Sequence, residues 1–574
     1  MIIRIKKSVS KNSISYSVIE NVRDINGKST TRVIEALGNE QEIRKKHPGV
    51  DPEEWARQYA KKLTEEQKSQ REPSIIKFNA EKLIDADEQR SFNVGYLFLQ
   101  SPYYQLGLSK ITQDIQSKYK FEYDLNEILS KLIYMRILHP NSKRSSFEQA
   151  KQLLEGIQCE PHQMYRALDI LKKESDNIQS AVYKNSLKLV QRHKKILYYD
   201  CTNFYFEMEQ EEGLKRYGVS KEHRPNPIVQ MGLFMDASGL PLAFSIFGGN
   251  ENEQTSLKPL EKKILKDFEL SEIVVCTDAG LSSKNNRIYN TLGSRGFITT
   301  QSIKKLKKHL KEWALDPSGW RTKASDKPIN LTSIKNIENN KETYYKERWI
   351  KENDLEQRLL VTFSPKYKHY QETIRKRQIE RALKKVENPS SLKKKRANDP
   401  LRFVTVKHAT TDGEIAENMH VTLDESVIEK EAQYDGFYGI CTNLTSDPLE
   451  LIRVNQQRWE IEESFRIMKT ELKSRPIYVR NDDRVEAHFL TCFLSLLIYR
   501  ILEQKLDNNF SCQKIIKTLR EMNVMKTSGD GYIPLYERTH LTDQLHEIFG
   551  FRTDYEINTI KKMKNNLKLS RKAK

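Results

Sequence analysis

Three carboxylates stand on separate predicted elements and are the strongest candidates for chemistry. Asp200 lies in a predicted strand, Asp278 ends a second short strand, and Glu462 lies on a predicted helix. Three carboxylates on a rigid scaffold suit two Mg²⁺ ions, because these ions take hard oxygen ligands and keep positions open for water and phosphate. Taken singly, each aspartate has an equally good structural role: Asp200 bonded to Thr202 or Asn203, and Asp278 as a helix cap.

The helix that carries Glu462 is predicted over Arg453–Lys473, a stretch with no glycine or proline and many helix-forming residues. Arg458, Glu462, Arg466 and Lys469 recur at helical spacings that place them on one face. From these residues alone two interpretations stay open: an exposed helix with ordinary ion pairs, or a carboxylate flanked by cations that neutralise phosphates.

Composition limits the class of protein. At 574 residues the chain is too long for one core and predicts three or four domains. Its net charge of +19 favours a polyanionic partner, with nucleic acid ahead of an anionic membrane surface. The six cysteines are scattered singly, which predicts a reducing compartment and no zinc site. The N-terminus lacks a signal-peptide pattern, and the most apolar run, Phe489–Tyr499, is shorter than the ~20 residues of a membrane span. We therefore expect a soluble, intracellular protein.

The regions that precede the carboxylates differ in pattern. Residues 1–39 predict a β meander with a hairpin turn at Asp24–Gly27, and Asp51 opens a charged helix that runs to about Gln70. Residues 92–193 predict several helices, including Leu125–Leu138. These helices suit either a DNA-binding domain that reads DNA with His162–Leu171 or a plain helical bundle.

At Lys195 the pattern changes from helices to strands. The strands expected at 196–206, 228–235 and 242–247 are followed by a helix, a strand ending at Asp278, a second helix and a strand at 296–301. This is the order of a ribonuclease H-like fold. Residues 302–435 interrupt it with basic runs at Lys304–Lys308 and Lys393–Arg396 and with strand-like pieces. A strand at 436–443 and a buried helix at 485–505 then complete the core.

Taken together, the chain resembles the DDE transposases of bacterial insertion sequences, in the branch whose third acidic motif reads Tyr-x2-Arg-x3-Glu-x6-Lys. Arg458, Glu462 and Lys469 match that spacing, which selects Glu462 over Glu460 and Glu463. Asn455 departs from the tyrosine of the motif, which puts that residue's DNA-backbone contact in question and leaves the carboxylate intact. Four further blocks occur in the expected order: Asp200–Glu207, Gly218–Pro225, Gly248–Glu253 and Thr277–Leu281.

The resemblance implies a fold and an activity. The fold is α/β, with a ribonuclease H-like catalytic core, a β-rich insertion, an N-terminal β meander and a helical region. Asp200, Asp278 and Glu462 are implied as catalytic ligands of two Mg²⁺ ions, for which Mn²⁺ substitutes. The implied partners are double-stranded DNA with terminal inverted repeats, target DNA and a second copy of the chain, with no membrane. The implied place of action is the bacterial cytoplasm, at the nucleoid.

Several other residues are expected to contact DNA. Arg458, Arg466 and Lys469 would neutralise phosphates, and Lys221, His223 and Arg224 either hold a phosphate or form a solvated loop. An exposed aromatic residue of the insertion stacks on a displaced base in some relatives. Trp320 is the best candidate here, with Trp313 and Trp349 as rivals and core packing as the alternative for each. Trp459 is expected to pack beneath the catalytic helix.

These expectations give a scheme of six regions. They are a meander with its connecting helix (1–71), a helical, DNA-binding region (72–193), the first part of the core (194–301), the basic insertion (302–435), the second part of the core (436–510) and a basic C-terminal region (511–574).

Two other functions compete with an active transposase. One is a catalytically idle DNA-binding derivative, against which the presence of all three carboxylates argues. The other is a ribonuclease H-like nuclease such as a junction resolvase, which would cut without rejoining and would leave the helical region and the insertion without a role.

Overall fold

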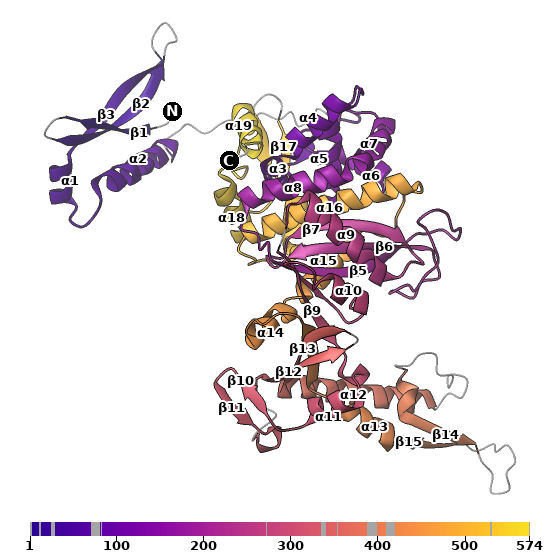
Figure 1. Ribbon diagram of the computed structural model, residues 1–574. Helices are drawn as coiled ribbons and strands as arrows, with labels where there is room; N and C mark the ends of the chain where they lie inside the picture. The colour runs from indigo at the N-terminus through magenta and orange to yellow at the C-terminus, as the bar shows by residue number, and fades with distance from the viewer. Residues whose placement is uncertain are drawn as a thin grey trace. The chain divides into compact units, whose positions relative to one another are not determined.

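In the computed structural model the chain forms two compact units, Met1–Ala86 and Asp87–Lys574, and each is described by itself (Figure 1). The structure describes residues 3–10, 13–23, 29–69, 81, 83–270, 272–334, 340–352, 354–386, 399–408, 419–527 and 531–572.

The first unit is the predicted β meander with two helices. β1 (Ile3–Val9), β2 (Ile14–Arg23) and β3 (Ser29–Asn39) pair antiparallel in that order, and α1 (Glu40–Lys46) and α2 (Pro52–Ser69) follow. Alternate side chains of β2, Tyr16 and Val18, are buried with residues of α1 and α2, because successive strand residues face opposite sides. The turn predicted at 24–27 lies outside the described residues.

The second unit is built on a ten-stranded sheet whose order is β11-β10-β12-β13-β16-β9-β8-β5-β6-β7. β5, β6 and β7 form an antiparallel meander, β8 and β9 run parallel to β5, and β16 is antiparallel to β9. The strands in this half of the sheet are β5 (Ile196–Tyr205), β6 (Ile228–Asp236), β7 (Pro241–Gly248), β8 (Val274–Thr277), β9 (Gly296–Gln301) and β16 (Phe437–Thr442).

Strands of the insertion extend the same sheet. β13 pairs with β16, and β12 pairs with β13, so the insertion is continuous with the core through backbone hydrogen bonds. The insertion also carries helices, one of which is 22 residues long. Its elements are η1 (Ile303–Lys305), α11 (Lys308–Leu315), β10 (Trp320–Thr322), β11 (Ser325–Ile329), η2 (Leu331–Ser333), β12 (Tyr344–Glu352), β13 (Leu355–Phe363), α12 (Pro365–Val386), η5 (Pro400–Phe403), β14 (Val404–His408), β15 (Met419–Leu423) and α13 (Glu425–Ala432). The basic run predicted at 393–396 lies outside the described residues.

A long apolar helix joins the helical region to the sheet. α16 (Asp482–Lys505) packs against α3, α5, α7 and β7, and residues of all these elements share one core (Figure 1). Within the described residues α16 alone is long and apolar enough to cross a membrane, and 89% of its apolar window is buried inside the protein, as in a core helix. The helices of this region are α3 (Leu97–Gln105), α4 (Leu108–Lys118), α5 (Leu125–Leu138), α6 (Lys143–Ala150), α7 (Pro161–Lys173) and α8 (Ser175–Leu189).

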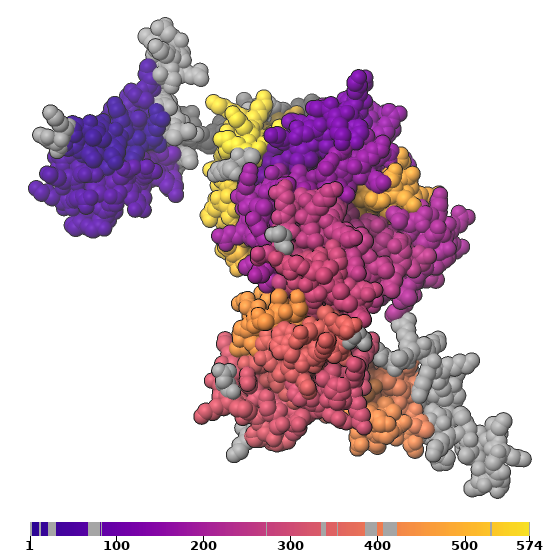
Figure 2. All heavy atoms as spheres, viewed as in Figure 1, coloured from indigo at the N-terminus to yellow at the C-terminus, as the bar shows by residue number. Residues whose placement is uncertain are grey.

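The C-terminal residues also belong to this core. β17 (Asn523–Lys526) pairs with β4 (Ser91–Asn93) and β18 (Tyr532–Pro534), and the Asn93 side-chain amide donates to the Leu519 carbonyl at 2.9 Å. α17 (Cys512–Glu521) packs on α5, while α18 (His540–Phe549) and α19 (Ile560–Ser570) pack on α3. In Figure 2 the yellow C-terminal residues lie against the purple helical region.

Candidate active site

Asp200 lies in the middle of β5 on the sheet face that carries the helices after β16. Tyr199 and Cys201 face the other side, where they are buried with residues of α9 (Glu253–Asp267). Tyr198 shares the face of Asp200, and its hydroxyl donates to the Val454 carbonyl at 2.9 Å. The Asp200 carboxylate accepts from the Cys201 backbone N–H at 2.8 Å, whereas the sequence had suggested Thr202 or Asn203 as partners.

Asp278 follows β8, the parallel neighbour of β5. The register pairs Tyr198 with Cys276, so two residues further along each strand Asp278 comes beside Asp200, about one strand spacing of 4.8 Å away. The Asp278 carboxylate accepts from the Leu281 N–H at 2.9 Å. The alternative that Asp278 caps a helix is wrong, because Ser283 caps the helix that follows. The two aspartates therefore form an adjacent carboxylate pair.

The environment of Asp200 disfavours its charged form. Burial raises the pKa of Asp200 to about 6, and the neighbouring Asp278 charge acts in the same direction. Lys221, the Cys201 N–H and Arg458 oppose this increase. A partly buried carboxylate beside a second carboxylate is a set of hard oxygen donors that a divalent cation would stabilise, so these residues fit such an ion.

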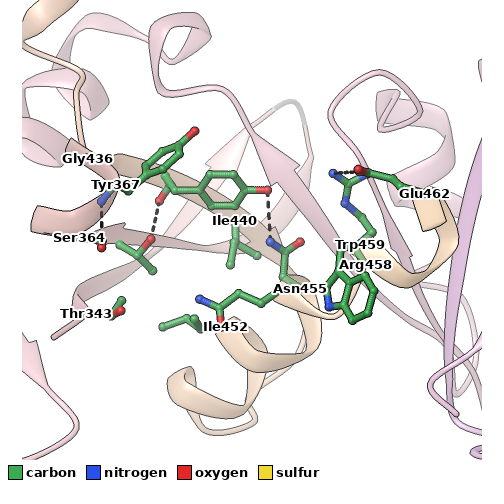
Figure 3. Close-up of a pocket in the computed structure, with 13 residues that line it drawn as sticks. Thr343, Ser364, Tyr367, Gly436, Ile440, Ile452, Asn455, Arg458, Trp459 and Glu462 are labelled. Atoms are coloured by element: carbon green, nitrogen blue, oxygen red, sulfur yellow. Dashed lines mark hydrogen bonds and ion pairs between the residues drawn. The ribbon is translucent and has the colours of Figure 1, made fainter. Parts of the chain in front are cut away.

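Glu462 lies on α15 (Trp459–Thr470), which packs on β5. Its carboxylate pairs with Arg458 Nη2 at 3.3 Å, and its side chain is 57% exposed (Figure 3). Arg458 is thus near both carboxylates, because it pairs with Glu462 and its charge also lowers the pKa of Asp200. Among the described residues no three His, Cys, Asp or Glu side chains are close enough together to hold a metal ion. The three-carboxylate set therefore stays a prediction.

The predicted continuous helix over 453–473 is wrong. The structure has α14 (Pro448–Gln456) and α15, separated by a turn at Gln457 and Arg458. The reason is the Tyr198 hydroxyl, which binds the Val454 carbonyl that would accept from Arg458 N–H in a continuous helix. Arg458 N–H instead donates to the Asn455 carbonyl.

The position of the motif tyrosine is buried. The Asn455 amide donates to the Tyr438 hydroxyl at 3.3 Å, and both residues line the cavity that Arg458 and Glu462 border (Figure 3).

The structure brings only some of the predicted DNA-binding cations together. Lys469 and Lys221 lie near one another, and Arg224 lies over the Tyr205 ring at 4.3 Å in the same loop as Lys221. His223 is in this loop and has a left-handed backbone, with φ of 59°. Arg466 instead pairs with Glu463.

Sequence reasoning missed Arg475, which lies beyond α15 and pairs with the carboxylate of Glu222, as does Lys469. Its position six residues after Lys469, near the end of a basic stretch, was the available signal.

The prediction that Trp320 is exposed is wrong. Trp320 is fully buried, donates from its indole N–H to the Asp316 carbonyl at 2.8 Å, and packs against Phe363 and Phe437. Of its two rivals, Trp313 is partly buried beside Lys346, whereas Trp349 is 47% exposed.

The prediction for Trp459 is also wrong, because this residue was expected to be buried and is exposed. It is 60% exposed rather than packed beneath the helix. With Tyr367 and Tyr438 it lines a cavity of about 370 Å³ that Glu462 and Arg458 also border (Figure 3). An exposed aromatic residue beside Glu462 therefore belongs to the motif helix itself.

Comparisons with known proteins identify the family of the chain. The family model of the transposase DDE domain matches residues 192–498, which is more than half of the chain, so the protein belongs to the DDE transposase family. The model of the N-terminal domain of IS1634 family transposases matches residues 3–74. The chain is accordingly a DNA transposase of the insertion-sequence type, a metal-dependent enzyme that cuts and joins DNA.

Among solved structures, the piggyBac transposase synaptic complex with hairpin DNA matches 76% of this chain and 82% of its own, with 8% identity and a TM-score of 0.37. A search of curated proteins gave no match.

Proposed function

We propose that this transposase binds the terminal inverted repeats of its element and cuts and joins DNA in a ribonuclease H-like core, with Asp200, Asp278 and Glu462 as ligands of two Mg²⁺ ions. The observation that carries the proposal is the adjacency of Asp200 and Asp278 on parallel strands, facing the helix of Arg458 and Glu462. The strand order β7-β6-β5-β8-β9, three antiparallel strands and then two parallel ones, supports the fold assignment.

The residues of the chain would position and neutralise the DNA phosphate. Divalent ions bound here would lower the pKa of the attacking water or 3′-hydroxyl and stabilise the leaving oxygen. Arg458 and Lys221 place positive charge beside Asp200, where a scissile phosphate would enter, and positioning with electrostatic stabilisation does most of the work in phosphoryl transfer. In this proposal the exposed Glu462 side chain would leave Arg458 and turn toward the aspartate pair when the ions bind.

The decisive variant is Glu462→Gln, assayed with a duplex that ends in the element's inverted repeat and with Mg²⁺ or Mn²⁺. We expect loss of cleavage and strand joining with DNA binding retained, because the substitution removes a ligand charge and keeps the shape of the side chain. The matched control is Glu463→Gln on the same helix. The Glu463 carboxylate pairs with Arg466, and we expect its substitution to leave strand joining intact. Strand transfer by Glu462→Gln at the wild-type rate would refute the assignment.

The same assay separates the competing functions. An idle derivative would bind the duplex without cutting it, and a resolvase-like nuclease would cut it without joining the freed 3′-hydroxyl to target DNA. Inverted repeats bordered by short direct repeats in the flanking DNA would favour a mobile element, and their absence would favour the idle derivative. Joining two ends requires two active sites, so we propose a homodimer on DNA, which analytical ultracentrifugation with end duplexes would detect.

The helical region 72–193 is proposed to read the inverted repeat through α7. Its apolar residues Met164, Leu168 and Leu171 are buried, which leaves His162 and Arg166 exposed. Arg166→Ala would test this role, with weaker binding to end duplexes as the expected result.

A further inference from the structure

The carboxylate of Glu222 lies between two cations at the end of the motif helix. Its oxygens pair with Lys469 Nζ at 3.4 Å and with the Arg475 guanidinium. The side chains of Glu222, Lys469 and Arg475 are 20%, 14% and 23% exposed, so the cluster is largely withdrawn from water. Charge pairs in such a setting are screened less by salt than pairs on an open surface.

The loop that carries Glu222 is fixed beside the catalytic strand. The Asn203 side chain on β5 bonds the loop in both directions, donating to the Val219 carbonyl at 3.0 Å and accepting from Lys221 N–H at 3.2 Å. Lys221 Nζ donates to the Cys201 carbonyl, next to Asp200. The loop of the Glu222 cluster is therefore attached to β5 beside Asp200, so the cluster lies next to the candidate active site.

The pairing in this cluster is incomplete. Among the described residues, Arg475 Nε is buried without a hydrogen-bond partner, and Glu222 Oε1 has only the 3.4 Å ion pair with Lys469. Burial lowers the pKa of Lys469, and the nearby charges of Arg475 and Lys221 act in the same direction, whereas Glu222 opposes them. One carboxylate is thus shared by two cations and leaves the Nε donor of Arg475 unused, while the third nearby cation, Lys221, pairs with Glu253 at 3.2 Å. A phosphate has more acceptor oxygens than a carboxylate and suits the guanidinium fork and an ammonium together.

We propose that Lys469 and Arg475 form a binding site for a DNA backbone phosphate, and that the Glu222 carboxylate occupies this site until DNA displaces it. The proposal rests on the DNA-binding function of the chain and on the phosphate contact already expected of Lys469, and it adds Arg475 to that contact and Glu222 as an internal competitor. Because the carboxylate and a phosphate cannot share the site, every bound duplex must first separate Glu222 from Arg475. A duplex of arbitrary sequence makes fewer other contacts with the protein than a terminal repeat does, so this separation weakens its binding most. Glu222 therefore increases the selectivity for the element's ends over other DNA.

The test is equilibrium binding of the full-length protein to a fluorescent duplex of arbitrary sequence, in EDTA and over a series of KCl concentrations. Glu222→Gln removes the competing charge and keeps the side-chain shape, and we expect about tenfold tighter binding. Arg475→Ala should weaken binding about tenfold and reduce the slope of log K against log[KCl] by about 1. In the double variant the gain from Glu222→Gln should shrink, because its target cation is gone. The control is Glu269→Gln, whose carboxylate pairs with the distant Lys184 and should leave binding unchanged.

Equal or weaker binding by a folded Glu222→Gln variant would overturn the proposal and make Glu222 a structural partner of Arg475. Should that variant fail to fold, the salt dependence of Arg475→Ala decides, and an unchanged slope overturns the phosphate site. Because EDTA removes metal-dependent chemistry, these results are independent of the Glu462→Gln cleavage assay.

Discussion

The carboxylate of Asp200 lowers the stability of the protein at neutral pH, and Asp200→Asn should recover that loss. Burial and the adjacent Asp278 raise the pKa of Asp200 from 3.8 to about 6. The folded state therefore holds this proton more tightly than the unfolded chain does. As pH rises through this interval the unfolded state releases its proton first, and the free energy of unfolding falls.

The pKa difference sets the size of the effect. At about 1.36 kcal/mol per pKa unit, the ionised Asp200 destabilises the fold by up to about 3 kcal/mol above pH 6. This figure is an upper bound because the residue keeps some exposure to water. The cost declines below pH 6 and disappears only below about pH 3, where both states are protonated. Asparagine keeps the shape and the acceptor for the Cys201 N–H, so it removes the charge selectively.

Urea denaturation at pH 7.5 and pH 4.5, in EDTA and followed by tryptophan fluorescence, measures this difference. We expect Asp200→Asn to be more stable than wild type at pH 7.5 and to keep only about a third of that gain at pH 4.5, while Asp114→Asn on the exposed side of α4 changes neither. Added Mg²⁺ should stabilise the wild type more than the variant. An equal gain at both pH values, or no gain at pH 7.5, would show that the reasoning from burial and Asp278 is wrong.

Three further changes test the packing. Trp320→Ala should destabilise the insertion by about 3–5 kcal/mol, whereas the half-exposed Trp349→Ala should stay within about 0.5 kcal/mol, as differential scanning calorimetry would show; similar small effects would contradict the buried position of Trp320. Lys143 is buried, its Nζ has no hydrogen-bond partner in the described part of the chain, and burial lowers its pKa to about 7 from 10.5. The charged form of Lys143 therefore lowers the free energy of unfolding most at low pH, and this loss disappears as pH rises toward 10.5. Lys143→Met should raise the melting temperature more at pH 6 than at pH 9.5. A Cβ at Gly95 would lie 1.9 Å from the Leu519 carbonyl oxygen, so Gly95→Ala should destabilise the helical region by about 3 kcal/mol and speed its proteolysis; wild-type resistance would refute the contact with α17.

Local patterns predicted much of the secondary structure. The helix expected over Leu125–Leu138 has those bounds, because Asp124 caps its first turn and His139 ends it. The meander and the strands around Asp200 were also predicted, since alternation and apolar runs follow directly from a buried sheet. Interactions within a few residues of one another decided these elements.

Long-range contacts decided what sequence patterns could not show. A hydroxyl from β5 binds the Val454 carbonyl where the helix is interrupted before Arg458, and two aromatic rings, Phe363 and Phe437, pack against the buried Trp320. Neither long-range contact can be seen in the local sequence. The adjacency of Asp200 and Asp278 likewise depends on the parallel register of two strands. Motif spacing selected Glu462, and its placement beside the aspartates depends on side-chain rotation.

The route of the chain into and out of the insertion has an evolutionary consequence. Gln301 at the end of β9 is the antiparallel partner of Gly439 in β16, so the segment between them leaves and re-enters the core at neighbouring backbone positions. Closing the chain across one strand spacing requires only a tight turn, and the entropy of loop closure grows slowly with length. Such a segment can therefore be gained, lost or exchanged in evolution without moving the aspartates. A shorter enzyme would arise by deleting the insertion and joining β9 to β16 through a hairpin turn.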